Sequence, residues 1–225
     1  MSIGIIIQAR MGSTRLPGKI LKNIGKKNLL EHILFRLKLL NNKTGIVIAT
    51  TDLEKDDIVS DFCNINNISC FRGSEENVLQ RYYLCAKKNN FSHIIRLTGD
   101  NPFTDIEELD NLINLHLSTK SDYSRSFALL PKGVGAEIFT MQALEESYLK
   151  GYKDNHKEHV NEYIEENESL FNISELTVDI QKKQPQISLT VDTEDDYQKA
   201  CYIVKNAKKE YINTEEAISL CLQYV

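Results

Sequence analysis

The sequence has no tryptophan and no long apolar run, and its 225 residues include only four prolines and five cysteines. No apolar segment approaches the roughly 20 residues that a membrane-spanning helix requires, so the sequence predicts no membrane partner. The short apolar run near the N-terminus has no basic residue before it and is not expected to be a signal peptide. The cysteines are dispersed and nowhere spaced as C-x-x-C, which favours reduced core thiols over zinc ligands or disulfides. We therefore expect a cytoplasmic protein.

Two common phosphate-binding motifs are also missing. A Walker loop needs four residues between its first glycine and its Gly-Lys, followed by Ser or Thr. Here five residues separate Gly12 from Gly18, and Ile20 follows Lys19. The dinucleotide motif G-x-G-x-x-G does not occur either. The sequence therefore argues against P-loop and Rossmann phosphate sites.

Basic residues are concentrated near the N-terminus of an otherwise acidic chain. The first thirty residues contain six Lys or Arg and no Asp or Glu, while the whole chain carries a formal charge of −5. The β-branched apolar run Ile3–Ile7 ends at Gln8, and the loop that follows carries Arg10, Arg15 and Lys19. Such a loop after a buried strand predicts a site for a small, multiply charged anion. Because the rest of the chain is acidic, no nucleic-acid partner is expected. A solvated surface loop remains the structural alternative.

Strand and helix patterns alternate along the chain and predict an α/β fold with a mostly parallel sheet. The predicted strands are residues 3–7, 45–49, 68–71, 92–97, 122–126, 136–139, 171–178 and 187–191. The predicted helices are residues 28–40, 54–63, 75–88, 105–117, 141–150, 157–166, 193–206 and 214–222, with 181–185 as a turn or exposed linker. We expect one domain over 1–225, with 128–180 as an inserted segment.

Polar clusters follow four of the predicted strands. They are Gln8–Lys19, Thr50–Asp52, Thr98–Asp100 and Asp192. Because ligands bind outside the carboxyl ends of parallel strands, these clusters are expected to face one crevice, cationic at one end and acidic at the other. A nucleoside triphosphate with Mg²⁺ suits that division. Each carboxylate also has a purely structural interpretation, since Asp100 can begin a turn and Asp192 can flank a helix start.

Residues 8–19, Gln-Ala-Arg-Met-Gly-Ser-Thr-Arg-Leu-Pro-Gly-Lys, resemble the signature of the cytidylyltransferases that make CMP-activated sugar acids. Four later stretches resemble the spore-coat polysaccharide biosynthesis (SpsF-like) branch: Phe71–Glu75, Val78–Tyr82, Leu97–Asp100 and Glu158–Val160. The resemblance implies a three-layer α/β sandwich of the nucleotide-diphospho-sugar transferase (GT-A-like) type, often dimeric through its inserted segment. It implies transfer of CMP from CTP to an acidic sugar or phosphorylated small-molecule acceptor, with release of pyrophosphate, in polysaccharide or glycoconjugate biosynthesis.

The resemblance also implies roles for particular residues. The implied catalytic residues are Arg10, Arg15, Lys19 and Asp100, and Asp100 and Asp192 would carry Mg²⁺. The implied CTP-binding residues are Ala9, Gly12, Ser13, Thr50, Asp52, Arg72 and Arg81. The implied acceptor-binding residues are Glu137, Lys157 and His159.

The chain departs from the branch pattern in two places, both in the acceptor region. Gly135 stands where the branch usually has an acidic residue, and Lys157-Glu-His-Val-Asn161 replaces the usual Arg-Glu-His-Val-Thr. These departures put the identity of the acceptor in question. His159 could serve as a general base or an acceptor contact, and its spacing from His156 leaves a zinc interpretation open.

Three other functions remain compatible with the sequence. A glycosyltransferase of the same fold usually carries Asp-x-Asp, which does not occur here. A guanylyl- or uridylyltransferase of the same fold is also possible, because the sequence alone does not determine which nucleotide base is bound. A non-catalytic nucleotide-binding protein would be expected to have lost Lys19, Asp100 or Asp192, and all three are present.

Overall fold

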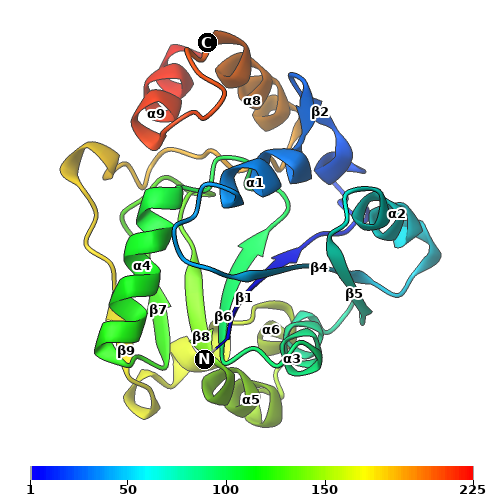
Figure 1. The fold of residues 1–225 in the computed structure, drawn as a ribbon, viewed down its shortest axis with the longest axis vertical. Coiled ribbons are helices and arrows are strands. Elements are labelled where there is room, and N and C mark those ends of the chain that lie inside the picture. The colour runs from blue at the N-terminus through cyan, green and yellow to red at the C-terminus, as the bar shows by residue number, and fades with distance from the viewer. Residues whose placement is uncertain (1, 225) are drawn as a thin grey trace.

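The computed structural model describes residues 2–224, which form a seven-stranded sheet with helices on both faces (Figure 1). The strand order is β5 (Ser69–Gly73), β4 (Gly45–Thr51), β1 (Ile3–Gln8), β6 (His93–Thr98), β8 (Glu137–Thr140), β7 (Tyr123–Arg125) and β9 (Ile173–Glu175). The first four strands are parallel, β8 runs antiparallel to both of its neighbours, and β9 is parallel to β7. The α/β class and the mostly parallel sheet are confirmed. A small hairpin of β2 (Asn23–Ile24) and β3 (Lys27–Asn28) lies outside this sheet.

The helices form the outer two layers. On one face, α1 (Leu29–Leu37), α2 (Asp57–Ile65) and α4 (Ile106–Thr119) share a core with α8 (Glu194–Asn206) and α9 (Thr214–Gln223). On the other face, α3 (Val78–Lys88), α5 (Met141–Lys150) and α7 (Glu162–Glu166) cover a second core. The short helix α6 (Asp154–Glu158) lies next to α3 on that face.

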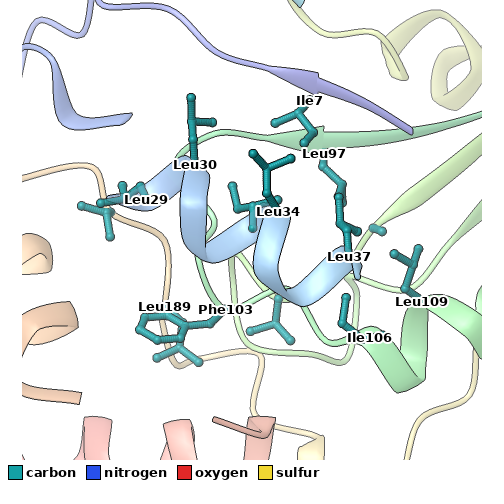
Figure 2. Packing of buried hydrophobic residues seen from close by; sticks show 14 of the residues in the cluster. Ile7, Leu29, Leu30, Leu34, Leu37, Leu97, Phe103, Ile106, Leu109 and Leu189 are labelled. Carbon is teal, nitrogen blue, oxygen red and sulfur yellow. The ribbon is translucent and has the colours of Figure 1, made fainter. Parts of the chain in front are cut away.

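β1 is an interior strand of the sheet and is buried on both faces, which explains why its sequence has no polar residue before Gln8. Ile5 and Ile7 pack into the core under α1, and Ile6 packs into the core under α3. Figure 2 shows the first of these cores, where Leu30, Leu34 and Leu37 of α1 lie close to Ile7 and Leu97. Burying each such side chain contributes about 1.5–3 kcal/mol, so this core holds β1 rigidly at the level where its polar loop begins.

Helix starts follow the local capping chemistry that the sequence predicts. Asn28 accepts a hydrogen bond from Glu31 N at 2.9 Å, and the Glu31 carboxylate accepts one from Asn28 N at 2.7 Å. Thr193 and Asp196 form the same reciprocal capping box at α8. Asp105 caps α4 by accepting from Glu108 N at 3.0 Å. These three predicted helix starts are confirmed.

Two predicted elements are wrong. The helix expected over 157–166 is split into α6 and α7, because His159 adopts an extended backbone with φ −112° and ψ 110°. The strand expected over 187–191 makes only an isolated bridge between Lys132 and Ser188. The backbone of this segment forms hydrogen bonds to Lys132 and Asp100, which lie in two different loops. Leu189 N donates to Lys132 O at 2.8 Å, and Val191 N donates to Asp100 O at 2.9 Å.

Smaller differences occur in the middle third of the chain. The strand expected over 171–178 is shortened to β9. Lys182, expected in an exposed linker, is only 4% exposed and contacts the carboxylates of Asp105, Glu107 and Glu108. Residues 128–180 contribute β8 and β9 to the main sheet. None of the helices within residues 2–224 has the length and apolar character to cross a membrane.

Candidate functional site

A pocket of about 370 Å³ opens where β1 and β6 end side by side. The predicted residues that line it are Ala9, Arg10, Gly12, Ser13, Arg15, Lys19, Asp100 and Asp192. Gln8 and Thr98, which begin two of the predicted polar clusters, also line it and are register partners at the last position of their strands. Glu158 lines it as well and was not predicted as a site residue. The structure thus gathers residues from both ends of the chain into one cavity.

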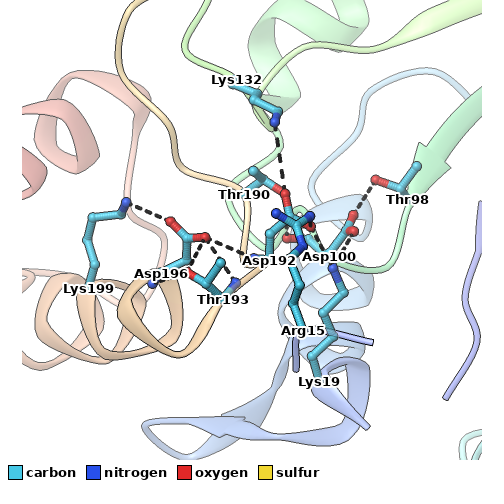
Figure 3. A network of polar contacts seen from close by, with 10 residues as sticks. All are labelled: Arg15, Lys19, Thr98, Asp100, Lys132, Thr190, Asp192, Thr193, Asp196 and Lys199. Atoms are coloured by element: carbon cyan, nitrogen blue, oxygen red, sulfur yellow. Dashed lines mark hydrogen bonds and ion pairs between the residues drawn. The ribbon is translucent and has the colours of Figure 1, made fainter. Parts of the chain in front are cut away.

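Lys19 is the central group of this pocket. Its Nζ lies 2.8 Å from Asp100 Oδ2 and 2.8 Å from Asp192 Oδ1, as Figure 3 shows. Gly18 places it there: its φ of 67° turns the chain into a short 3₁₀ helix, Lys19–Leu21, that starts at the lysine. Lys19 itself is only 8% exposed. A buried ammonium between two carboxylates is a preorganised charge cluster rather than a solvated surface contact.

Asp192 is surrounded by cations although no strand leads into it. Arg15 Nη2 lies 3.4 Å from Asp192 Oδ1, and Lys132 Nζ lies 3.9 Å from Asp192 Oδ2 (Figure 3). The start of α8 fixes its backbone, because Asp192 N donates to Asp196 Oδ2 at 3.2 Å and Lys199 Nζ holds Asp196 at 3.0 Å. The carboxylate therefore projects into the pocket from a firmly held helix start.

Asp100 is held in an equally defined position. Thr98 Oγ1 donates to Asp100 Oδ1 at 2.6 Å, and the Asp100 carbonyl accepts from Val191 N. Its side chain is 25% exposed, and that of Asp192 is 17% exposed. The two carboxylates can therefore contact both the protein and a ligand in the pocket.

The donor set fits a hard divalent cation. Within residues 2–224 there is no group of three or more His, Cys, Asp or Glu side chains that could hold a metal ion. Asp100 and Asp192 thus offer two carboxylates, which is the usual protein share for Mg²⁺ bound with waters and substrate phosphates. The Lys19 ammonium contacts one oxygen of each, so Lys19 and a metal ion would compete for these oxygens.

The cationic loop is anchored from beneath by Asp56, a residue that sequence reasoning missed. Asp56 is fully buried, its Oδ1 accepts from Met11 N at 2.6 Å, and its Oδ2 accepts from the Thr51 hydroxyl. In the sequence, Asp56 and Asp57 indicate only the start of a helix, so no sequence signal identifies the contacts of Asp56 with Met11 and Thr51. Beside it, Glu75 Oε1 contacts Lys55 Nζ at 2.6 Å and Arg10 Nη1 at 3.8 Å.

Four residues implied as CTP contacts lie outside the pocket lining: Thr50, Asp52, Arg72 and Arg81. Arg72 donates to the carbonyls of Thr51 and Leu53 at 3.0 and 2.9 Å, so it supports the end of β4. Arg81 is fully buried and donates to Ser74 O, and burial lowers its pKa. Its Nε and Nη2, and the Thr50 hydroxyl, are buried without a partner within residues 2–224. Asp52 is exposed.

The three implied acceptor residues are not gathered at one point. Glu137 lines a second pocket beside the first, where its carboxylate is bonded to Arg96 and to the Tyr123 hydroxyl. Lys157 and His159 line neither pocket, and Lys157 Nζ contacts Asp154 Oδ1 at 2.9 Å. Their neighbours Glu158 and Asn161 line the first and second pockets respectively.

Comparison with known proteins shows the family of the chain. The sequence profile of a family described as cytidylyltransferase matches residues 4–218. Spore coat polysaccharide biosynthesis protein SpsF of Bacillus subtilis (strain 168) is 39% identical over 222 residues, which cover 96% of this chain and 92% of SpsF. A cytidylyltransferase structure from Leptospira borgpetersenii serovar Hardjo-bovis (strain JB197) is 33% identical with a TM-score of 0.92, covering 99% of this chain and 94% of that one.

A more distant structure shares the fold. CMP:2-keto-3-deoxy-manno-octonic acid synthetase, solved in complex with CTP, is 18% identical with a TM-score of 0.68 and covers 91% of this chain and 99% of its own. The fold is therefore that of the nucleotide-diphospho-sugar transferases, with the pocket at the carboxyl ends of its parallel strands. The chain belongs to the cytidylyltransferase family, as the resemblance of residues 8–19 implied.

Proposed function

We propose that this protein transfers CMP from CTP to an acidic sugar or phosphorylated small-molecule acceptor and releases pyrophosphate, in the cytoplasm, for polysaccharide or glycoconjugate biosynthesis. The observation that carries the proposal is the contact of Lys19 with both Asp100 and Asp192. It brings together, in one pocket, a cation suited to phosphate and two carboxylates suited to a metal ion. Family membership and the similarity to SpsF support the nucleotide and the pathway class.

The reaction we propose is a single in-line displacement. An acceptor oxygen attacks the α-phosphorus of CTP, a new P–O bond forms, and the bond to the bridging oxygen of the β-phosphate breaks. Pyrophosphate leaves with that electron pair, and the acceptor proton, where there is one, passes to solvent or to a nearby base. Arg10, Arg15 and Lys19 neutralise the charge that builds up on the leaving pyrophosphate, which is a preorganised electrostatic role.

Asp100 and Asp192 would hold the metal ion, which we propose is Mg²⁺. When bound, it would polarise the α-phosphate and orient it for attack. Lys19 would then leave the carboxylates and bind the phosphates. The lysine lies in the same pocket as Ser13 and Arg15, where we propose that the phosphates bind.

We propose that the nucleotide base is read at the ends of β1 and β4. Gln8, Ala9 and Arg10 line the pocket, and Gln8 Oε1 is buried without a partner within residues 2–224. Thr50, Asp52, Arg72 and Arg81 would contribute from β4, the turn after it, β5 and α3, and Arg72 supports the end of β4 by donating to the Thr51 carbonyl. Gly12 and Ser13 would bring the loop backbone close to the phosphates.

The segment 128–180 is proposed as an acceptor and dimerisation segment of a single nucleotidyltransferase domain, with Glu137, Lys157 and His159 on its acceptor side. Three large apolar side chains on it are well exposed: Leu149, Tyr152 and Leu170. A homodimer that covers them would be detected by light scattering coupled to gel filtration. A Leu149→Glu variant that keeps the molecular mass of the wild-type dimer in solution would contradict this interface.

The test of the function is thermal unfolding with CTP, UTP, GTP and ATP, each with and without Mg²⁺. A ligand at a hundred times its dissociation constant stabilises by about 2.7 kcal/mol, and in a chain of this size each kcal/mol shifts the midpoint by about 2–4 °C. We expect the full shift only with CTP and Mg²⁺ together. Equal shifts with UTP would contradict the base assignment, and no shift with any nucleotide would favour a non-catalytic protein.

A further inference from the structure

A second charge cluster lies against the cationic loop, formed by residues that follow β4 and β5. Glu75 Oε1 accepts a hydrogen bond from Lys55 Nζ at 2.6 Å and lies 3.8 Å from Arg10 Nη1. Arg10 lines the first pocket, whereas Lys55 and Glu75 lie outside its lining. A single carboxylate oxygen therefore faces two cations, one of which belongs to the pocket.

The ion pair of Lys55 and Glu75 packs directly on Gly12. A Cβ atom at Gly12 would lie 3.0 Å from Lys55 Nζ and 3.1 Å from Glu75 Oε1. A side chain here would push against both charged groups, whereas glycine lets them approach the backbone of the loop. Gly12 also lines the first pocket. The ion pair and the pocket therefore lie against the same residue.

Both charged side chains project from firmly held backbone. Lys55 is the neighbour of the buried Asp56, which accepts a hydrogen bond from Met11 N at 2.6 Å. Glu75 lies in the turn before α3, where the buried Arg81 donates to the carbonyl of the preceding residue. The side chains themselves are partly exposed, at 45% for Lys55 and 26% for Glu75. They can therefore exchange partners without a movement of the backbone.

Glu75 differs from Asp100 and Asp192 in what replaces its cations. In the proposed function a metal ion takes the place of Lys19 at those two carboxylates. Nothing in that reaction replaces the cations at Glu75. An incoming polyphosphate carries more negative charge than one carboxylate and attracts the same two cations. Glu75 is thus placed to compete with the phosphates rather than to bind with them.

We infer that Lys55 is a further binding residue for the pyrophosphate portion of CTP, and that Glu75 competes with this portion by holding Lys55 and Arg10. The inference rests on the proposed function, in which Arg10 neutralises the leaving pyrophosphate. Lys55 joins Arg10 in that role because both face the same Glu75 oxygen. When the triphosphate binds, the two cations turn from Glu75 to its terminal phosphates, and they return when pyrophosphate leaves.

The two substitutions that test this should act in opposite directions. Isothermal titration measures the Kd of CTP, pyrophosphate and CMP, each with Mg²⁺ and at low ionic strength. Lys55→Met should raise the Kd of CTP and of pyrophosphate about tenfold, since it removes a charge-assisted contact. Glu75→Gln should lower the same two constants by about three- to fivefold, as expected for a partly exposed charge pair. Neither should change the Kd of CMP more than about twofold.

The ion pair between Lys27 and Glu210 provides matched controls. These two residues contact each other and lie outside the lining of the first pocket. Lys27→Met and Glu210→Gln remove the same charges from the protein and should leave all three constants within about twofold of the wild type. The midpoint of thermal unfolding without ligand verifies that each variant is folded. The gain from Glu75→Gln should also shrink as salt is added, because salt screens exposed charges.

Unchanged binding of CTP and pyrophosphate by a folded Lys55→Met variant would overturn the inference, as would an equal loss for CMP. Equal or weaker CTP binding by Glu75→Gln would show that this carboxylate does not compete with the phosphates. Effects of the same size in the Lys27 and Glu210 variants would reduce both findings to net charge. A wild-type protein that binds no CTP would instead reject the proposed function, and pyrophosphate alone would still test Lys55 and Glu75.

Discussion

Lys19 Nζ and Asp192 Oδ1 are 2.8 Å apart although 173 positions separate the two residues in the chain. The contact ties the first loop of the fold to the start of α8 and places both beside Asp100. A cation and two carboxylates that meet in this way define the charge balance of the whole pocket, and the first two predictions follow from it.

Lys19→Ala should cut turnover by about a hundredfold while the protein remains folded. Removing one preorganised contact to developing charge typically costs about 3 kcal/mol of transition-state stabilisation. The measurement is kcat for pyrophosphate release, with circular dichroism to verify the fold. Near-normal turnover in a well-folded variant would remove Lys19 from the mechanism.

Lys19→Met should bind Mn²⁺ more tightly than the wild type when no nucleotide is present. The wild-type ammonium contacts an oxygen of each carboxylate, so a metal ion must displace it, whereas methionine offers no competing charge. Isothermal titration with Mn²⁺ alone tests this. Lys22→Met is the control, because Lys22 lies outside the pocket lining, 3.6 Å from the exposed Glu194 and over the Tyr197 ring. Unchanged or weaker Mn²⁺ binding in Lys19→Met would show that the lysine and the metal do not compete.

Lys182→Met should destabilise the fold by about 3–5 kcal/mol, because it leaves buried carboxylates without their counter-charge. Lys182 Nζ lies 3.1 Å from Asp105 and 2.8 Å from Glu108, and both carboxylates are nearly fully buried. Urea unfolding measures the change. The neighbouring Lys183→Met lies outside this cluster and should change stability by less than about 0.5 kcal/mol. Similar midpoints for the two variants would mean that the cluster contributes little.

Stability should fall as the pH drops from about 6.5 toward 4, in part because of His116. His116 is buried, with Nε2 2.9 Å from His93 Nδ1 and Nδ1 2.8 Å from Ser124 Oγ. Burial, and then the neighbouring His93, lower its pKa to about 4. As the pH falls, the unfolded chain takes up the proton at His116 before the folded chain does. The contribution of His116 to the free energy of unfolding is therefore complete above the unfolded pKa of about 6.5 and is lost as the pH falls toward the pKa of the folded state.

In the His116→Gln variant, the free energy of unfolding should fall by about 2 kcal/mol less than in the wild type between pH 7 and pH 4.5. Urea unfolding at several pH values compares it with the wild type and with His159→Gln, where the side chain is exposed. A pH profile for His116→Gln that parallels the wild type would assign the acid sensitivity to other groups.

Much of the nucleotide side could be predicted because its signals are local in sequence. The apolar run Ile3–Ile7 predicts a buried strand, and the basic loop after it predicts an anion site. Asn28 and Thr193 begin helices through contacts three residues away, which sequence spacing reveals directly. Asp100 and Asp192 could be placed together because strand ends converge in parallel sheets, even though Asp192 reaches the site without a strand.

The acceptor side could not be predicted because its contacts depend on tertiary partners. The resemblance implies that Glu137 contacts the acceptor, but the pairing of its carboxylate with Arg96 on the next strand has no local sequence signal. The segment 187–191 has a strand-like composition, but no neighbouring strand extends alongside it. The resemblance implies that Arg81 binds CTP, and the sequence alone does not indicate that the fold buries it completely. Burial and pairing across the sheet have no local signal in any of these cases.

The insertion of β8 between β6 and β7 has a consequence for how such a protein can diversify. The first pocket is lined from β1 and β6 and by no residue of β8, whereas the second is lined from β6, β8 and the segment 127–136. Substitutions on β8 and in the segment 127–136 can therefore reshape the second pocket without altering the phosphate loop. One scaffold can in this way change what it activates while it keeps the same activating nucleotide.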